Sequence, residues 1–315
     1  MSNLKYQAGH ELKKAALNIT AKNYVLNNPV LFNLLLKGAR RYIGGQNLAE
    51  VIATVKQTNS SGIPVAVEFM GESVASAAEA NEATTEFLEL IETIKADKLS
   101  SFVALDLSHI GLSVSLELAF TNLLQLAEAT KNTPIELIIS AEGVERTNDV
   151  LDIFSKASPL YPQLGITVQA YLHRSMGDLE NLINNTQGRI RLVKGAFAAP
   201  EDLILQRGDA LDARYLQLVE LLLINNRKCA IASHHDKIHS AVKELLKLHE
   251  TPAELYEFEM LYGIQEELLK SLQASGYPCR QYIVYGREWY LYLCNRIAEY
   301  PDNLFRFLID VLKQD

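Results

Sequence analysis

Three cations fall close together on one predicted strand, in the segment RIRLVKGAFAAP at residues 189–200. Because side chains alternate along a strand, Arg189 and Arg191 share one face, and Lys194 belongs to the opposite face. Gly195 follows directly and permits a close approach of the backbone to another group. One interpretation is structural, with the arginines in salt bridges on the helix-facing side and the lysine amine reaching solvent. The other is a binding site for an electron-rich, anionic ligand.

Two adjacent histidines, His234 and His235, lie at the end of the predicted strand KCAIASH (228–234). Neighbouring side chains on a strand point to opposite faces, and no HxxH or CxxC motif supplies further ligands, which disfavours a metal site. A histidine that forms hydrogen bonds at the strand end fits better. A purely structural histidine is the competing interpretation.

The helix REWYLYLCNRIAEY (287–300), interpreted as the last of the chain, carries polar groups on one face. At positions i, i+3, i+4 and i+7 stand Tyr292, Asn295, Arg296 and Glu299. That spacing normally belongs to an apolar stripe. Either the face is solvated, with a weak contact to Glu299, or it is a pocket wall in which Arg296 binds a carboxylate and Glu299 orients Arg296.

Regular elements must place these residues, and eight short β-rich runs recur, alternating with stretches of helical periodicity. The runs are 64–70, 101–107, 135–140, 165–171, 189–195, 228–234, 256–261 and 280–285. Eight such strands pair in parallel through right-handed crossovers and predict a (βα)8 barrel. An open doubly wound sheet is the alternative, but no GxGxxG motif follows the first strand.

The barrel is expected to form a single catalytic domain over residues 61–315, preceded by a helical segment over residues 1–60. In such a barrel, catalytic groups gather where strands end and the following loops begin. Polar or charged residues occur at nearly every predicted strand end, among them Asp106, Ser140 and Gln169. This position alone decides little, because surface loops are polar as well.

The 315 residues are 48% hydrophobic and 22% charged, which is typical of a globular protein able to bury a cofactor. The net charge of −8 argues against nucleic acid as the main partner. Three irregularly spaced cysteines (Cys229, Cys279, Cys294) fit a reducing cytoplasm better than a disulfide framework or zinc site. No signal-peptide core or transmembrane stretch is evident. We therefore expect a cytoplasmic protein, and a peripheral contact with the inner membrane face stays open.

Taken together, the motifs resemble the proline dehydrogenase family over about residues 35–310. They are RRYIGG, VEFMGES, VQAYLHR, RIRLVKGAF, IASHH, EFEMLYGI and YIVYGREWYLYLCNRIAEYPDNL. RLVKGA and the YG…WY.Y…R block are the most specific. The resemblance implies a distorted (βα)8 barrel with FAD as cofactor, and oxidation of proline or a proline-like cyclic secondary amine to the imine. It also implies hydride transfer to flavin N5 and a quinone or other carrier as electron acceptor.

The same resemblance assigns a set of cofactor-binding residues. They are Gln169, Arg191, Lys194, Gly195, Ala196, Phe197 and His234. In the family, the arginine and lysine of this set lie near flavin N5 and the pyrophosphate or ribityl oxygens. The glycine and alanine give backbone contacts, the glutamine bonds the ring, and the histidine approaches the cofactor. Cations near the ring favour the reduced, anionic flavin, which would explain positive charge at the end of a strand.

A substrate wall is implied as well. Its members are Leu261, Tyr282, Tyr292, Arg296 and Glu299, with Glu72 as an entrance gate that pairs with an arginine. They are expected to enclose the proline ring and to hold its carboxylate.

The chain departs from the family pattern at four positions near the substrate. Asn295 replaces one of two adjacent arginines, Asp106 a lysine, Ser140 the first acid of Asp-Ala-Glu, and Phe197 a tyrosine. The changes remove two cations, and two charge-assisted contacts of ~1.5–3 kcal/mol each would weaken a free carboxylate by several powers of ten. We therefore expect a retained flavin half and a rebuilt substrate half, in which Asp106 pairs with a substrate amine or with Arg296.

Three functions follow from these residues. The first is oxidation of proline or a similar amine. The second is a flavin-binding relative that has lost proline oxidation, or that acts on a proline derivative whose carboxylate is masked as a thioester or amide. The third is an unrelated barrel lyase or isomerase with a phosphate-bearing substrate, but YGIQEE and YGREWY lack the glycines of a phosphate cradle.

Overall fold

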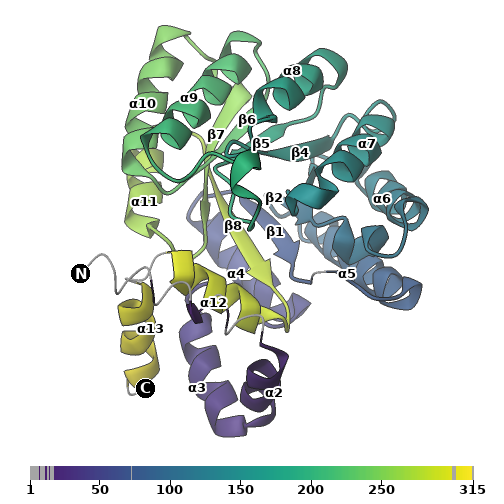
Figure 1. The fold of residues 1–315 in the computed structure, drawn as a ribbon, viewed down its shortest axis with the longest axis vertical. Coiled ribbons are helices and arrows are strands. Elements are labelled where there is room, and N and C mark those ends of the chain that lie inside the picture. The colour runs from purple at the N-terminus through teal and green to yellow at the C-terminus, as the bar shows by residue number, and fades with distance from the viewer. Residues whose placement is uncertain are drawn as a thin grey trace.

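Eight parallel strands close into a barrel in which each strand pairs with the next along the chain and β8 pairs with β1 (Figure 1). The computed structural model describes residues 18–71, 73–299 and 303–313, together with residues 7, 11, 12 and 14. The strands are β1 (Val65–Phe69), β2 (Ser101–Leu105), β3 (Leu137–Ile139), β4 (Leu164–Gln169), β5 (Ile190–Val193), β6 (Cys229–Ala232), β7 (Tyr256–Leu261) and β8 (Cys279–Tyr285). The predicted (βα)8 barrel is confirmed, and each predicted strand end lies within two residues of the observed one.

A ring of helices covers the barrel, one after each of the first seven strands. They are α5 (Ala77–Ala96), α6 (Leu116–Thr130), α7 (Thr147–Ala157), α8 (Ser175–Asn185), α9 (Asp209–Ile224), α10 (Asp236–Leu248) and α11 (Glu266–Ala274). Short turns of π- or 3₁₀-helix lie in the connections, namely η1 (Ser108–Leu112), η2 (Val144–Arg146), η3 (Glu201–Leu203) and η4 (Ala253–Leu255). The buried apolar faces of the seven α-helices pack on the outward side chains of the strands and form the larger core.

The eighth position of the ring is filled in an unusual way, which makes the barrel distorted. Helix α4 (Leu48–Ser60), which precedes β1, contacts β1 and β8 on the outside. The backbone N–H of Gly44 donates to the carbonyl of Val284, 2.8 Å away, and so ties the approach to α4 onto β8. Helix α12 (Trp289–Glu299), which follows β8, contacts α3 (Pro29–Ala39) and α13 (Asn303–Leu312) instead. As a result α12 lies beside β8, next to α3 and α13, rather than in the ring of helices (Figure 1).

The N-terminal helices join the C-terminal end of the chain. Asn28 ends α2 (Ile19–Asn27) and caps α3, because its side-chain oxygen accepts from the N–H groups of Val30 and Leu31, each 3.1 Å away. Helix α3 packs on α13, and the guanidinium of Arg41 pairs with Asp310 of α13. The interpretation of α12 as the last helix is therefore wrong, since α13 follows it with its own amphipathic pattern.

The arginines of β5 point into the barrel, while Ile190 and Leu192 face the helices as part of the larger core. Arg189 pairs with Glu257 of β7, two strands away in the barrel, at 3.3 Å, and Arg280 of β8 donates to the same carboxylate at 2.8 Å. The structural interpretation of the arginines is therefore wrong about the face, although salt bridges do form. Alternation along a strand predicts which residues share a face, but not which face turns inward.

Candidate functional site

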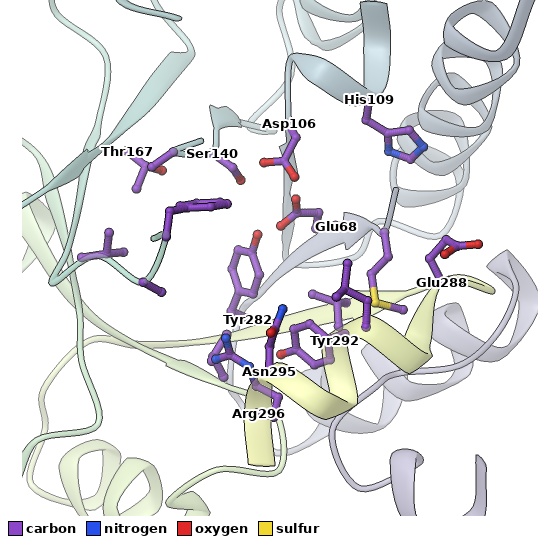
Figure 2. Close-up of a pocket in the computed structure, with 18 of the residues that line it drawn as sticks. Glu68, Asp106, His109, Ser140, Thr167, Tyr282, Glu288, Tyr292, Asn295 and Arg296 are labelled. Atoms are coloured by element: carbon purple, nitrogen blue, oxygen red, sulfur yellow. The ribbon is translucent and has the colours of Figure 1, made fainter. Parts of the chain in front are cut away.

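A cavity of about 1600 Å³ opens at the carboxyl ends of the strands, and all eight strand ends contribute to its wall. Typical sites for one small ligand measure about 300–1,000 Å³, so this cavity has room for more than one molecule. Its lining includes Glu68, Asp106, Ser140, Gln169, Arg191, Ala232, Leu261 and Tyr282 from the strands or the residues just after them. Figure 2 shows the carboxylates of Glu68 and Asp106 beside the hydroxyl of Ser140.

Arg191 lies on the cavity floor, with its guanidinium held on three sides. Its Nε donates to Oγ1 of Thr167 at 2.9 Å, and one terminal nitrogen donates to Oγ of Ser140 at 3.0 Å. The other terminal nitrogen stands 3.6 Å from a carboxylate oxygen of Glu259. The guanidinium also lies over the ring of Tyr282, 4.6 Å from its centre. Four strands thus fix one buried cation in a single orientation.

Lys194 follows β5 and turns toward α9. Its amine donates to Asp212 and lies 3.1 Å from Nδ1 of His235. The interpretation that this amine reaches solvent freely is therefore wrong, because the helix behind the strand supplies its partner. Both Lys194 and Asp212 line the cavity, so this ion pair forms part of its wall.

The backbone after Lys194 makes a turn that only glycine adopts easily. Gly195 has φ +104°, and a Cβ placed there would stand 2.2 Å from a ring carbon of Tyr171. The hydroxyl of Tyr171 donates to the carbonyl of Phe197 at 3.3 Å. Ala196 and Phe197 line the cavity, and the Phe197 side chain is 41% exposed there. This loop therefore brings backbone and one aromatic ring close to whatever the cavity binds.

His234 is buried at the end of β6, and its Nε2 accepts the backbone N–H of Leu261 at 2.9 Å. The second ring nitrogen, Nδ1, must then carry the proton. Burial, together with the weaker effect of the nearby Arg296 guanidinium, lowers the pKa of His234 to about 3. His234 is thus a neutral donor on the cavity wall, whereas His235 turns to Asp212 at 3.2 Å. The two adjacent rings thus have different partners, although both line the cavity and do not point to opposite faces as expected.

Gln169 ends β4 and is fixed by its side-chain nitrogen, which donates to the carbonyl of Glu142 at 2.9 Å. The Glu142 carboxylate in turn accepts from Arg146 of the 3₁₀ turn η2 at 2.9 Å and from the Ser108 backbone at 2.9 Å. The loops after β2 and β3 are therefore joined around one buried carboxylate, and the end of β4 bonds to the backbone of the same residue.

Helix α12 forms the opposite wall and directs Tyr292, Asn295 and Arg296 toward the strand ends (Figure 2). The Arg296 guanidinium lies over the Tyr292 ring, 5.1 Å from its centre. These residues share the face that the sequence spacing predicted. The side chain of Glu299 and the whole of Glu72 lie outside the described residues, so their predicted roles stay predictions.

The predicted site residues do not include Glu68, His109 and Glu259, which also line this cavity. Strand alternation offered a signal for Glu259, which shares the face of Leu261. His109 lies in the π-turn η1, and its Nδ1 donates to the carbonyl of Phe69 at 3.2 Å. Burial lowers the pKa of His109 to about 4, so it too is neutral.

The described residues hold neither a cluster of metal ligands nor a helix suited to span a membrane. No three His, Cys, Asp or Glu side chains in the described ranges are grouped so that they could hold a metal ion. In the same part of the chain, no helix combines the length and apolar character that crossing a membrane requires.

Comparisons with known proteins agree on one family. The family model described as proline dehydrogenase matches residues 51–304. Proline dehydrogenase 1 of Bacillus subtilis (strain 168) is 34% identical over 277 residues, which cover 88% of this chain and 91% of the relative. Proline dehydrogenase of Deinococcus radiodurans is 30% identical over 298 residues, covering 92% and 94%.

A solved structure shows the same fold. Proline utilization A (PutA) from Bdellovibrio bacteriovorus, inactivated by N-propargylglycine, superposes with a TM-score of 0.78 at 18% identity. The match covers 98% of this chain but only 44% of that longer protein. At this identity, the superposition supports the shared fold alone.

Proposed function

This chain belongs to the proline dehydrogenase family, and from that premise we propose that it oxidises proline, or a proline-like cyclic secondary amine, to the imine with FAD as oxidant. With proline, the product is of the pyrroline-5-carboxylate type. The observation that carries the proposal is the convergence of Arg191, His234 and Arg296 on one cavity at the barrel mouth. Such convergence of polar groups at the strand ends is where barrel enzymes carry their chemistry.

The residues present fit FAD. Arg191 offers a fixed, buried cation, and the Gly195 turn lets backbone approach a bulky ligand closely. Arg207 adds positive charge near the same loop, where its guanidinium donates to the Gly195 carbonyl at 3.4 Å, and the Lys194 amine, paired with Asp212, adds a donor. A polyanionic cofactor suits these donors. When bound, FAD supplies the acceptor for the hydride that leaves the substrate carbon.

The chain's own residues would bind the substrate and take up its proton. Arg296 would pair with a substrate carboxylate, and Tyr282 and Tyr292 would enclose the ring from opposite walls. The amine must lose its extra proton before its lone pair can help to expel the hydride. Asp106 or Glu68 would accept that proton, and the nitrogen lone pair then forms the C=N bond as the C–H bond breaks.

A proline derivative with a masked carboxylate is the second candidate. The specific observation is that two carboxylates, Glu68 and Asp106, line the same cavity as Arg296 (Figure 2). Two carboxylates repel a free substrate carboxylate, whereas an amide or thioester carries no such charge.

We also propose that residues 61–315 form the single catalytic domain and that the helical segment before residue 61 completes its cavity wall. Lys22 of α2 pairs with Glu288, and both residues line the cavity. Helix α4 packs on β1 and β8. The cavity wall therefore draws on both parts of the chain.

The test uses purified protein supplied with FAD. We expect a yellow flavoprotein whose visible absorption bleaches anaerobically with proline, hydroxyproline, pipecolate or a prolyl thioester, and a product two hydrogens lighter by mass spectrometry. If the protein binds flavin but no amine reduces it, the protein would be a flavin-binding relative that has lost proline oxidation. Protein that cannot be reconstituted with FAD would refute the proposal.

A further inference from the structure

The guanidinium of Arg191 is held by one charged and two neutral partners. Among the described residues, Glu259 is the carboxylate that pairs with this guanidinium, at 3.6 Å. The other two contacts, from Thr167 and Ser140, are neutral hydroxyls at 2.9 and 3.0 Å. This buried cation is therefore oriented by two neutral acceptors and paired with one carboxylate of the barrel interior.

The neighbouring carboxylate of β7 does not share this role. Glu257 accepts from Arg280 at 2.8 Å and pairs with Arg189 at 3.3 Å. It does not line the cavity, whereas Glu259 does. The barrel interior thus holds a deeper ion-pair network around Glu257 and a separate pair, Arg191 with Glu259, at the cavity floor.

Both members of the cavity pair are largely withdrawn from water, with exposed fractions of 6% each. Burial raises the pKa of Glu259, and the Arg191 charge opposes that rise most strongly. Because charges interact strongly in a buried, poorly screened region, a change of one charge here alters the local potential far more than it would on the surface.

We propose that Glu259 and Ser140 set the reduction potential of a flavin bound over Arg191, with Glu259 acting through the guanidinium as a positioning residue. The inference rests on the proposed function, because it requires FAD in the cavity. Reduction adds negative charge to the ring, and the Arg191 cation stabilises that charge. Glu259 offsets part of the cation and lowers the potential. Ser140 places a neutral hydroxyl against the second terminal nitrogen of Arg191. Because this hydroxyl carries no charge, it does not reduce the stabilisation that the guanidinium gives to the reduced flavin.

The two residues therefore predict shifts of opposite sign. Glu259→Gln keeps the side-chain size and removes the opposing charge, so the potential should rise. Ser140→Asp adds a second carboxylate against the same guanidinium, so the potential should fall. A purely structural role for either residue predicts altered stability without this pair of opposite shifts.

The experiment is an electrochemical titration of the FAD-loaded protein without any amine, followed by its absorption. We expect at least a tenfold change in the equilibrium constant for two-electron reduction with each variant, which equals about 30 mV. Ser140→Asn, neutral and similar in size to Asp, is the matched control for added charge. Glu257→Gln removes a charge from the same strand away from the cavity. Both controls should shift the constant less than threefold.

Glu259→Asp covers the case in which Glu259→Gln does not fold. It keeps the charge but withdraws it by one methylene, so the potential should rise by a smaller amount. Unchanged potentials in the Glu259 and Ser140 variants, or shifts in the same direction, would overturn the inference. Shifts as expected, in protein whose flavin no amine reduces, would support it while refuting the proposed reaction. Absence of FAD binding would overturn both.

Discussion

Nε2 of His234 accepts a hydrogen bond from the backbone N–H of Leu261, 2.9 Å away, and this bond joins the end of β6 to the end of β7. Both residues line the cavity. The bond also fixes the tautomer, so that Nδ1 carries the ring proton. His234 therefore offers a neutral donor without any titration step near neutral pH, since burial holds its pKa at about 3.

The buried histidines should make the protein sensitive to acid. The folded-state pKa values are about 3 for His234 and about 4 for His109, against an ordinary value of 6.5. Below pH 6.5 the unfolded chain binds protons that the folded chain excludes, so stability is complete above that pH and falls as the pH drops toward the folded values. For His109 the loss between pH 7.5 and pH 5 should be about 2 kcal/mol.

Urea unfolding of the wild type and of His109→Gln at those two pH values checks this expectation. The variant should lose less stability on acidification, by about 2 kcal/mol. His173→Gln, at an exposed position, controls for the exchange itself. If His109→Gln shows the full wild-type loss, the protonation of this ring does not limit acid stability.

Asn295→Arg should improve the oxidation of free proline. Asn295 stands next to Arg296 on the cavity wall, and a second guanidinium there adds a charge-assisted contact of ~1.5–3 kcal/mol to a carboxylate. We expect the KM for proline to fall tenfold or more in steady-state kinetics. Asn295→Gln, which changes size without charge, should not give this gain, and neither should prolinamide as substrate. A flat or higher KM for proline would contradict the account of the missing arginine.

Gly195→Ala should weaken both the fold and FAD binding. The backbone there has φ +104°, and the new methyl would meet the Tyr171 ring at 2.2 Å. We expect a loss of ~1–3 kcal/mol in the free energy of unfolding and a weaker FAD Kd by fluorescence titration. Gly177→Ala is the matched control, because Gly177 lies within α8 with nothing within 4 Å of the added Cβ. It should stabilise the protein by about 1 kcal/mol.

Glu136→Gln should destabilise the barrel without touching the cavity. The Glu136 carboxylate accepts from Arg189 and from Lys228, each at 2.6 Å, and does not line the cavity. Removing one partner of a buried ion pair costs ~3–5 kcal/mol, and Glu257 keeps part of the Arg189 charge compensated, so we expect the lower end. Asp152→Asn, which breaks the exposed pair with Lys156, should change the unfolding midpoint little. Equal effects of both changes would contradict the burial argument.

The sequence predicted the eight strands and their alternation with helices because those patterns are local. A run of β-branched residues indicates a strand, and apolar residues three or four positions apart indicate a helix. Both patterns lie within about a dozen residues. The shared face of Tyr292, Asn295 and Arg296 followed from helical geometry in the same way. Resemblance to one family then gave the fold in advance, and the comparisons confirm the family.

The sequence could not show which side of β5 faces the barrel interior. Arg189 and Arg191 suit a solvated face equally well, and only the partners Glu257 and Glu259, far along the chain, stabilise them inside. Nor could local patterns show that α4 fills the eighth place of the ring. Both outcomes depend on pairing across the closed barrel.

The sequence by itself thus determined the helices and strands, their order and the residue types available at the strand ends. The tertiary structure alone decided that Glu68, His109 and Glu259 meet Arg191 and α12 at one cavity. The physical reason is that burial of charge depends on partners brought together by barrel closure, and such partners leave no mark in the local pattern of either strand.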